Sequence, residues 1–164
     1  MAVQSGKFLT FALGEEEYGI PIQSVKEING IMDITIIPKM PKFMKGVINL
    51  RGKIIPVIDL RLKFALEELV YSQRTCIIVV EVGIGDSAKR LMGIVVDTVS
   101  EVVNILPTDI EEPPVFEYST DISFITGMGK VKGKVVMLLD IAKVLDTNEI
   151  SIIKNINVGG MENA

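Results

Sequence analysis

The sequence predicts a mostly β protein of two similar lobes packed on one another, with a few short helices. Apolar residues recur mainly with a period of two, in short runs that Gly, Pro, Asn or Asp interrupt, which is typical of many short strands. Blocks of the first half return in the second half, which indicates an internal duplication. The 164 residues are 48% hydrophobic and 23% charged, as in one globular domain or in two small lobes that share a core.

The strand pattern extends over most of the chain. The predicted strands are 7–13, 17–22, 25–30, 32–38, 46–50, 53–59, 75–83, 90–97, 99–107, 126–131 and 134–140. Short helices are predicted after Asp59, Asp140 and Thr147, because an Asp or Thr side chain can accept a hydrogen bond from the first helical turn. Many short strands favour small closed barrels, since closure leaves no edge strand unpaired.

The internal repeat consists of two blocks. The first block pairs Gly19-Ile20 and 25–28 with Gly93-Ile94 and 99–102, at an offset of 74 residues. The second block pairs Gly46 and 52–60 with Gly127 and 133–141, at an offset of 81 residues. We therefore predict one lobe at about 14–66 and another at about 83–147, with the N-terminal strand and the C-terminal helix packing across them. The tail 158–164 is expected to fray, since Gly159-Gly160 disfavours a helix.

Positions alike in both copies are expected to serve the shared backbone. Glycines that suit a positive φ, or a place with no room for a side chain, stand at matched positions: Gly46, Gly52, Gly127 and Gly133. Asp59 and Asp140 each end a strand before a helical turn, so helix capping is favoured over chemistry at both. Positions that differ between the copies, such as Arg51 against Lys132, are candidates for a task particular to one copy.

The residue inventory argues against an enzyme. With no histidine and one cysteine, the chain cannot form a disulfide framework, a Cys/His zinc site or a histidine-based catalytic triad. Cys76 lies in an apolar run and is expected to be a core thiol. The densest acidic group, 15–17, follows Gly14 and is interpreted as a solvated hairpin tip rather than a carboxylate site. We expect no catalytic residue, metal or cofactor.

Nucleic acids and membranes are also unfavoured partners. The formal charge is −4, aromatic residues make up 5% of the chain and tryptophan is absent, so phosphate contacts and base stacking have little support. The basic stretch 39–45 is a local exception, interpreted as a rigid loop with a mildly positive face. Apolar runs such as 76–80 fall short of the ~20 residues of a bilayer span, and the first residues lack the plan of a signal peptide. A cytoplasmic protein is expected.

Arg51 stands at the tip of a predicted hairpin between two apolar strands. A solvated side chain is one interpretation, and it is the usual outcome for such a position. The other is recognition, because the five donors of arginine suit a bidentate grip on a partner's carboxylate or amide. Asn49 would add a donor beside the same strand. From the residues alone the two interpretations have about equal weight.

Four stretches together carry a family resemblance. They are GVINLRGKIIPVIDLRLKF (46–64), GEEEYGIPIQSVKEI (14–28), LMGIVVDTVSEV (91–102) and FITGMGKVKGKVVMLLDIAKVL (124–145), and they resemble the CheW family of bacterial chemotaxis coupling proteins. The likeness extends from about Lys7 to Leu145. It implies a pair of five-stranded SH3-like barrels around a shared core. It also implies a non-catalytic adaptor between the regulatory domain of the histidine kinase CheA and the cytoplasmic tips of methyl-accepting chemoreceptors.

The resemblance further implies a receptor-binding groove between the lobes. Its residues would be Val25, Glu27, Lys45, Gly46, Asn49 and Arg51. Val25 and Glu27 would share one side of an extended strand, although the matching Val99 and Glu101 leave a structural role equally open for the pair. A turn is the first expectation for Gly46, and solvated lysine stays open for Lys45. For Arg51 the resemblance favours recognition.

The implied adaptor would be a monomer in isolation and would be recruited from the cytoplasm to receptor arrays. Each contact would be small and transient, and many linked copies would supply the strength. The regulatory domain of CheA itself and the hybrid adaptor CheV share the fold but carry additional domains, for which 164 residues leave no room. A role in a non-flagellar chemosensory pathway, or a barrel that binds a small ligand or nucleic acid, remains as an alternative.

Overall fold

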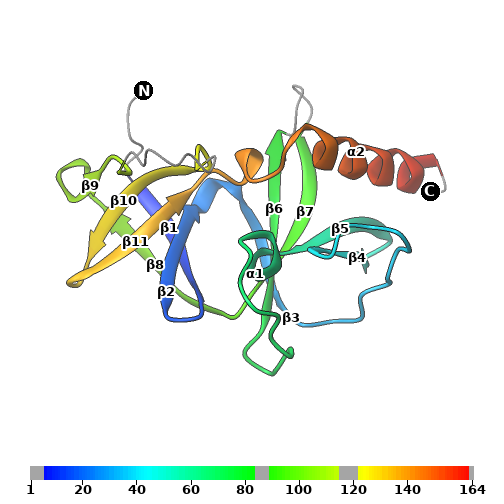
Figure 1. Cartoon of the computed structure of the whole chain (residues 1–164), viewed down its shortest axis with the longest axis horizontal. Coiled ribbons are helices and arrows are strands. Elements are labelled where there is room, and N and C mark those ends of the chain that lie inside the picture. The colour runs from blue at the N-terminus through cyan, green and yellow to red at the C-terminus, as the bar shows by residue number, and fades with distance from the viewer. Residues whose placement is uncertain (1–5, 84–88, 115–121, 163–164) are drawn as a thin grey trace.

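The computed structural model describes residues 6–83, 89–114 and 122–162, and these form two sheets side by side (Figure 1). The strands are β1 (Gly6–Leu13), β2 (Glu16–Pro21), β3 (Val25–Gly30), β4 (Met44–Leu50), β5 (Lys53–Asp59), β6 (Cys76–Gly83), β7 (Lys89–Val96), β8 (Thr98–Ile105), β9 (Ile110–Glu111), β10 (Ile125–Val131) and β11 (Lys134–Leu139). One sheet has six strands in the order β8-β1-β2-β11-β10-β9, and the other has five in the order β3-β6-β7-β5-β4. The prediction of a mostly β fold built of two similar units is confirmed.

Neither sheet closes into a ring through the pairing of its described strands, and β9 adds a sixth strand that was not predicted. All the predicted strands exist except 32–38, which makes only an isolated bridge between Thr35 and Val47. Met32 and Ile34 pack on an apolar cluster, so the alternation there reflects a loop lying on the core.

The repeat is present in the strand order, but the pairing does not follow the predicted lobe bounds. Matched positions equate β2 with β7, β3 with β8, β4 with β10 and β5 with β11. The five-stranded sheet therefore combines the last three strands of the first copy with the first two of the second, and the six-stranded sheet combines the last four strands of the second copy with the first two of the first. The chain crosses between the sheets through a 3₁₀ turn at Ile22–Ser24 and again at Asp97, so the expected lobes at 14–66 and 83–147 are corrected.

Two parallel strand pairs join the copies, β11 with β2 and β5 with β7. A matched glycine lies at each join. A Cβ on Gly19 would lie 3.1 Å from Leu138, and one on Gly93 would lie 3.0 Å from Ile77. These glycines are repeated because side chains from neighbouring strands approach them closely.

Apolar side chains form three clusters. A large central cluster lies between the sheets and contains Phe11, Ile58 and Ile94. A second cluster lies on the side of the five-stranded sheet that faces away from the central cluster, and a third lies on the corresponding side of the six-stranded sheet. Each fully buried aliphatic side chain contributes roughly 1.5–3 kcal/mol, so the central cluster holds the two sheets together.

Three short helical segments follow the strands as expected: α1 (Leu60–Lys63), the 3₁₀ turn Ile141–Lys143 and α2 (Thr147–Glu162). The Asp59 carboxylate accepts from the Leu62 N–H at 3.3 Å, and that of Asp140 accepts from the Ala142 N–H at 3.0 Å, which confirms both caps. A further 3₁₀ turn spans Pro107–Asp109.

The start and end of α2 differ from the prediction. Asp146, not Thr147, caps the helix, because its carboxylate accepts from the Glu149 N–H at 2.9 Å and Glu149 accepts from the Asp146 N–H at 2.7 Å. The helix also continues through Gly159-Gly160 to Glu162, so the expectation that these glycines end the helix is wrong, and residues 163–164 lie outside the described residues. α2 packs on β5, and Figure 1 shows it along the upper side of the five-stranded sheet. No helix in the described part of the chain is long and apolar enough to cross a bilayer.

Candidate partner-binding site

The hairpin between β4 and β5 turns at Arg51 and Gly52, whose φ angles are 51° and 88°. Two consecutive positive φ angles define a type I′ turn, which favours Asn or Gly at the first position. Arginine in this conformation costs about 1 kcal/mol, and the Asn49 side chain supports the turn by accepting from the Gly52 N–H at 2.8 Å. Gly52 and Gly133 are thus confirmed as turn glycines, since Gly133 has a φ of 78°.

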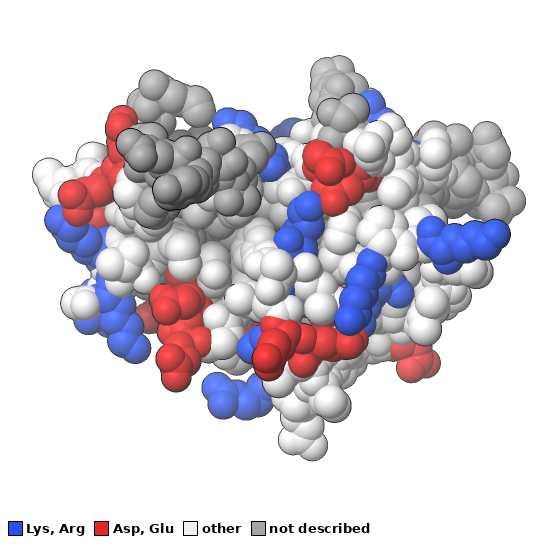
Figure 2. Space-filling view, viewed as in Figure 1, with Lys and Arg blue, Asp and Glu red and all other residues white. Residues whose placement is uncertain are grey.

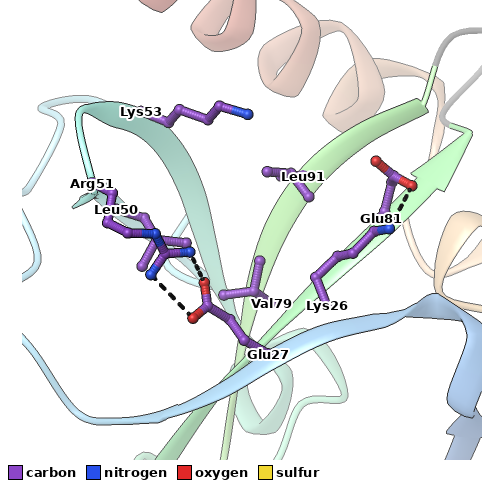
Figure 3. Close-up of a pocket in the computed structure, with 8 residues that line it drawn as sticks. All are labelled: Lys26, Glu27, Leu50, Arg51, Lys53, Val79, Glu81 and Leu91. Atoms are coloured by element: carbon purple, nitrogen blue, oxygen red, sulfur yellow. Dashed lines mark hydrogen bonds and ion pairs between the residues drawn. The ribbon is translucent and has the colours of Figure 1, made fainter.

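Arg51 forms a bidentate ion pair with Glu27 of β3 (Figure 3). Nη2 lies 2.5 Å from Oε1 and Nη1 lies 3.3 Å from Oε2. The hydrogen bonds from Arg51 lower the pKa of the Glu27 carboxyl, and those to Glu27 raise the pKa of the guanidinium. The Arg51 side chain is 73% exposed, so solvent screens the pair and leaves the guanidinium accessible to a partner.

A hollow of about 490 Å³ opens beside this ion pair. Its residues come from β3, β6, β7 and the β4–β5 hairpin: Lys26, Glu27, Leu50, Arg51, Lys53, Val79, Glu81 and Leu91. Leu50, Val79 and Leu91 form an apolar floor that continues the second cluster. Lys26 pairs with Glu81 at 3.3 Å, and Lys53 makes no ion pair with any described residue. An apolar floor with a charged rim suits an aliphatic side chain that carries polar neighbours.

Val25 and Glu27 do not share one side of β3, contrary to prediction. Val25 pairs with Val80 and Glu27 with Val79, so the intervening Lys26 is the extra residue of a β-bulge. Val79 and Val80 are consecutive in β6 and face opposite sides. Val25 therefore packs on the central cluster, whereas Glu27 reaches the hollow.

Lys45 and Gly46 lie at the opposite end of β4 from Arg51, about 20 Å away at the usual rise per residue. Lys45 pairs with Glu68 at 3.0 Å, which lowers the pKa of that carboxyl, and lies over the Tyr71 ring at 5.6 Å. Gly46 is not in a turn: it adjoins a bulge in β4, as Gly127 does in β10. Of the six predicted residues, only Glu27 and Arg51 line the hollow, and the wider receptor-binding groove stays a prediction.

The structure brings together Glu27, Asn49 and Arg51, and it adds the hollow beside them. The sequence analysis missed the floor and Lys53, because four separate strands contribute them. It also missed that Lys132 pairs with Glu101 at 3.0 Å, at positions matched to Arg51 and Glu27. The sequence contained a signal for this, because both copies have a glutamate and a cation at matched positions. The ion pair between the hairpin tip and the neighbouring strand is therefore a feature of the duplicated fold.

Figure 2 shows acidic and basic side chains interspersed across one face of the molecule. In the described ranges no three Cys, Asp or Glu side chains gather where they could hold a metal ion.

Comparison with known proteins identifies the family. The model of the CheW-like domain matches residues 7–149. The chain belongs to the CheW-like family. It is 41% identical over 150 residues to the chemotaxis protein CheW of Klebsiella aerogenes, covering 92% of this chain and 87% of that protein. It is 32% identical over 160 residues to CheW of Treponema pallidum, covering 95% and 92%.

A solved member of the CheW-like family has the same fold. The crystal structure of the scaffolding protein TtCheW from Thermoanaerobacter tengcongensis matches with a TM-score of 0.76 and 38% identity, over 89% of this chain and 96% of that one. The predicted resemblance to the CheW family is confirmed, and with it the interpretation of the chain as a non-enzymatic protein of chemotaxis.

Proposed function

We propose that this chain is a cytoplasmic adaptor that couples the histidine kinase CheA to the cytoplasmic tips of methyl-accepting chemoreceptors. The hollow beside Arg51 is the observation that carries the proposal, in a chain whose relatives are named chemotaxis and scaffolding proteins. It presents an apolar floor, a charged rim and a tightly turned hairpin, which are features of a recognition surface.

Recognition at the hollow would use its two kinds of surface. An aliphatic side chain of the partner would cover Leu50, Val79 and Leu91, while a carboxylate would meet Lys53 at the rim. Arg51 already holds Glu27, so a second acceptor would use the donors of the guanidinium that Glu27 leaves open. A helix of a receptor tip, with apolar residues at helical spacing and acids beside them, has this chemistry.

The CheA regulatory domain would bind elsewhere on the surface, which allows one copy to hold both partners. Each contact would be modest, and linkage of many copies in a membrane-associated array would raise the effective concentration of every partner. Receptor state could then bias the kinase through the geometry of the assembly.

The test is a pair of binding titrations, one with a receptor cytoplasmic fragment and one with the CheA regulatory domain. We expect Arg51→Ala to weaken binding of the receptor fragment by about 1–3 kcal/mol and to leave binding of the CheA regulatory domain unchanged, because an arginine that a partner covers is a frequent anchor of an interface. The matched control is Lys132→Ala, which removes the equivalent tip cation of the other copy and its pair with Glu101. Thermal melts of all three proteins would show whether either variant is unfolded.

Equal losses in Arg51→Ala and Lys132→Ala would assign the effect to the shared fold and contradict recognition at the hollow. If the wild type binds neither partner, the proposed coupling role is wrong. A second candidate is the same adaptor role in a different chemosensory pathway. The chain is 32% identical over 108 residues to Protein FrzA of Myxococcus xanthus, covering 66% of this chain and 64% of that protein, so the domain occurs under another name. Kinase and receptor fragments from each pathway of the host would distinguish the two.

A further inference from the structure

The segment 60–64 comprises α1 and Phe64. Three of its side chains differ in chemical type from those of the matching segment in the second copy, although both segments follow the same kind of strand. Positions matched to Arg61, Lys63 and Phe64 are filled by Ala142, Val144 and Leu145. Those three apolar residues pack on the central cluster. In the first copy Arg61 and Lys63 instead form ion pairs with Asp97 and Glu149, while Phe64 packs on the central cluster with an aromatic ring. Figure 1 shows α1 between the two sheets.

Arg61 joins the five-stranded sheet to a crossover of the chain. Its Nε donates to Asp97 Oδ1 at 2.8 Å, and its Nη1 donates to the Glu67 carbonyl at 2.8 Å. Asp97 is the residue between β7 of one sheet and β8 of the other, and its second oxygen accepts from the Gly14 N–H at 2.7 Å. Gly14 lies in the β1–β2 turn of the six-stranded sheet. Both side chains of the ion pair are less than a fifth exposed.

Lys63 joins α1 to the C-terminal helix α2. Its Nζ donates to both oxygens of Glu149 at 2.8 Å and lies 4.8 Å from the centre of the Phe43 ring. Glu149 is also the capping residue that receives the Asp146 N–H. This ion pair is again mostly buried, with exposed fractions of 19% and 13%. It connects α1, directly after β5, with α2, which packs on β5 and is joined through the Ile141–Lys143 turn to β11 of the six-stranded sheet.

Phe64 completes the connection through ring contacts. Its ring lies 5.7 Å from that of Tyr18 in β2 and 5.2 Å from that of Phe124, just before β10. Tyr18 in turn stacks on Phe11 at 5.9 Å. Phe64, which follows the five-stranded sheet, thus lies in a row of aromatic rings whose other members are in or beside strands of the six-stranded sheet.

We propose that Arg61, Lys63 and Phe64 are positioning residues that hold the two sheets at one relative orientation. The central cluster alone is apolar and non-directional, so it permits small rotations between the sheets. Two mostly buried ion pairs and a ring stack are directional, and they act at three separate places around α1. An adaptor that holds two partners at separate places on its surface would need this fixed orientation, and only this last consequence rests on the proposed function.

The experiment measures the distance between the sheets in the isolated protein. Cys76→Ser removes the native thiol, and Lys53→Cys with Lys134→Cys places nitroxide labels on the exposed, matched hairpins of the two sheets. Pulsed dipolar spectroscopy then gives the distance distribution. We expect one narrow peak in this background, and a broadened or shifted peak when Arg61→Ala, Lys63→Val and Phe64→Leu transplant the residues of the second copy.

Controls separate orientation from stability. Lys130→Ala removes an exposed ion pair within the six-stranded sheet and should leave the distance peak unchanged. Arg61→Lys keeps the positive charge, so its peak should lie closer than that of Arg61→Ala to the peak of the labelled protein without these substitutions. A narrow, unshifted peak in the folded triple variant would overturn the proposal. If the triple variant does not fold, narrow and unshifted peaks in Arg61→Ala and Phe64→Leu would overturn it. Partners are not used, so failure here is distinct from failure of the coupling role.

Discussion

Gly46 offers a direct test of whether a residue expected in the receptor groove acts through the fold. The perturbation is Gly46→Ala. Gly46 has a φ of 140°, and an added Cβ would overlap the Thr35 carbonyl oxygen and lie 2.8 Å from its carbon. That carbonyl accepts from the Val47 N–H at 2.9 Å, and the Thr35 N–H donates to the Val47 carbonyl at 2.8 Å. The loop before β4 therefore cannot move aside without losing both hydrogen bonds.

The expected cost follows from these contacts. Backbone strain at a positive φ costs about 1–3 kcal/mol, and two lost hydrogen bonds add about 0.5–1.5 kcal/mol each. We expect a total near 3 kcal/mol, which corresponds to a fall in Tm of roughly 6–12 °C for a chain of this length. Urea denaturation followed by circular dichroism gives the free energy of unfolding, and calorimetry gives the Tm.

The matched control is Gly30→Ala. Nothing lies within 4 Å of a Cβ at Gly30, which is also a β-strand glycine but has no positive φ. We expect its free energy of unfolding to change by a few tenths of a kcal/mol, within the usual range of exposed substitutions. If Gly46→Ala and Gly30→Ala unfold at the same urea concentration, the steric reasoning is wrong. If Gly46→Ala is destabilised, any loss of partner binding at this position is a consequence of the fold.

Two further predictions concern caps and pH. Asp140→Ala should cost about 1 kcal/mol of stability as the loss of a cap, whereas Asp59→Ala should cost about 1 kcal/mol more, because Asp59 also accepts from the Tyr71 hydroxyl at 2.8 Å. Equal costs in urea denaturation would contradict this difference. The pKa of the Glu27 carboxyl is lowered from its ordinary value of 4.5, so its contribution to stability is present above pH 4.5 and is lost as the pH falls through the lowered pKa. NMR titration should find the Glu27 pKa returned toward 4.5 in Arg51→Gln, and an unchanged pKa would mean that the ion pair does not form in solution.

Local patterns were sufficient for much of the fold. The period of two located the strands, and the matched Asp59 and Asp140 located two helix starts, because strand alternation and capping depend on neighbouring residues. The site was less predictable. Glu27 and Arg51 do meet, yet Lys45 lies at the far end of β4 and Val25 faces the central cluster. A single bulge at Lys26 places Val25, the first residue of β3, on the opposite side from Glu27, and no residue type marks such a bulge.

By itself, the sequence determined that this chain is a duplicated, mostly β protein, because both features are written in short-range alternation and in self-similarity. Only the tertiary structure decided which strands pair. The two copies are so alike that their sequences do not distinguish the observed pairs, β5 with β7 and β11 with β2, from the pairing of β2 with β5 and of β7 with β11. The choice rests on crossovers at Ile22–Ser24 and Asp97, and on side chains such as Arg61 that meet their partners only after the sheets have assembled.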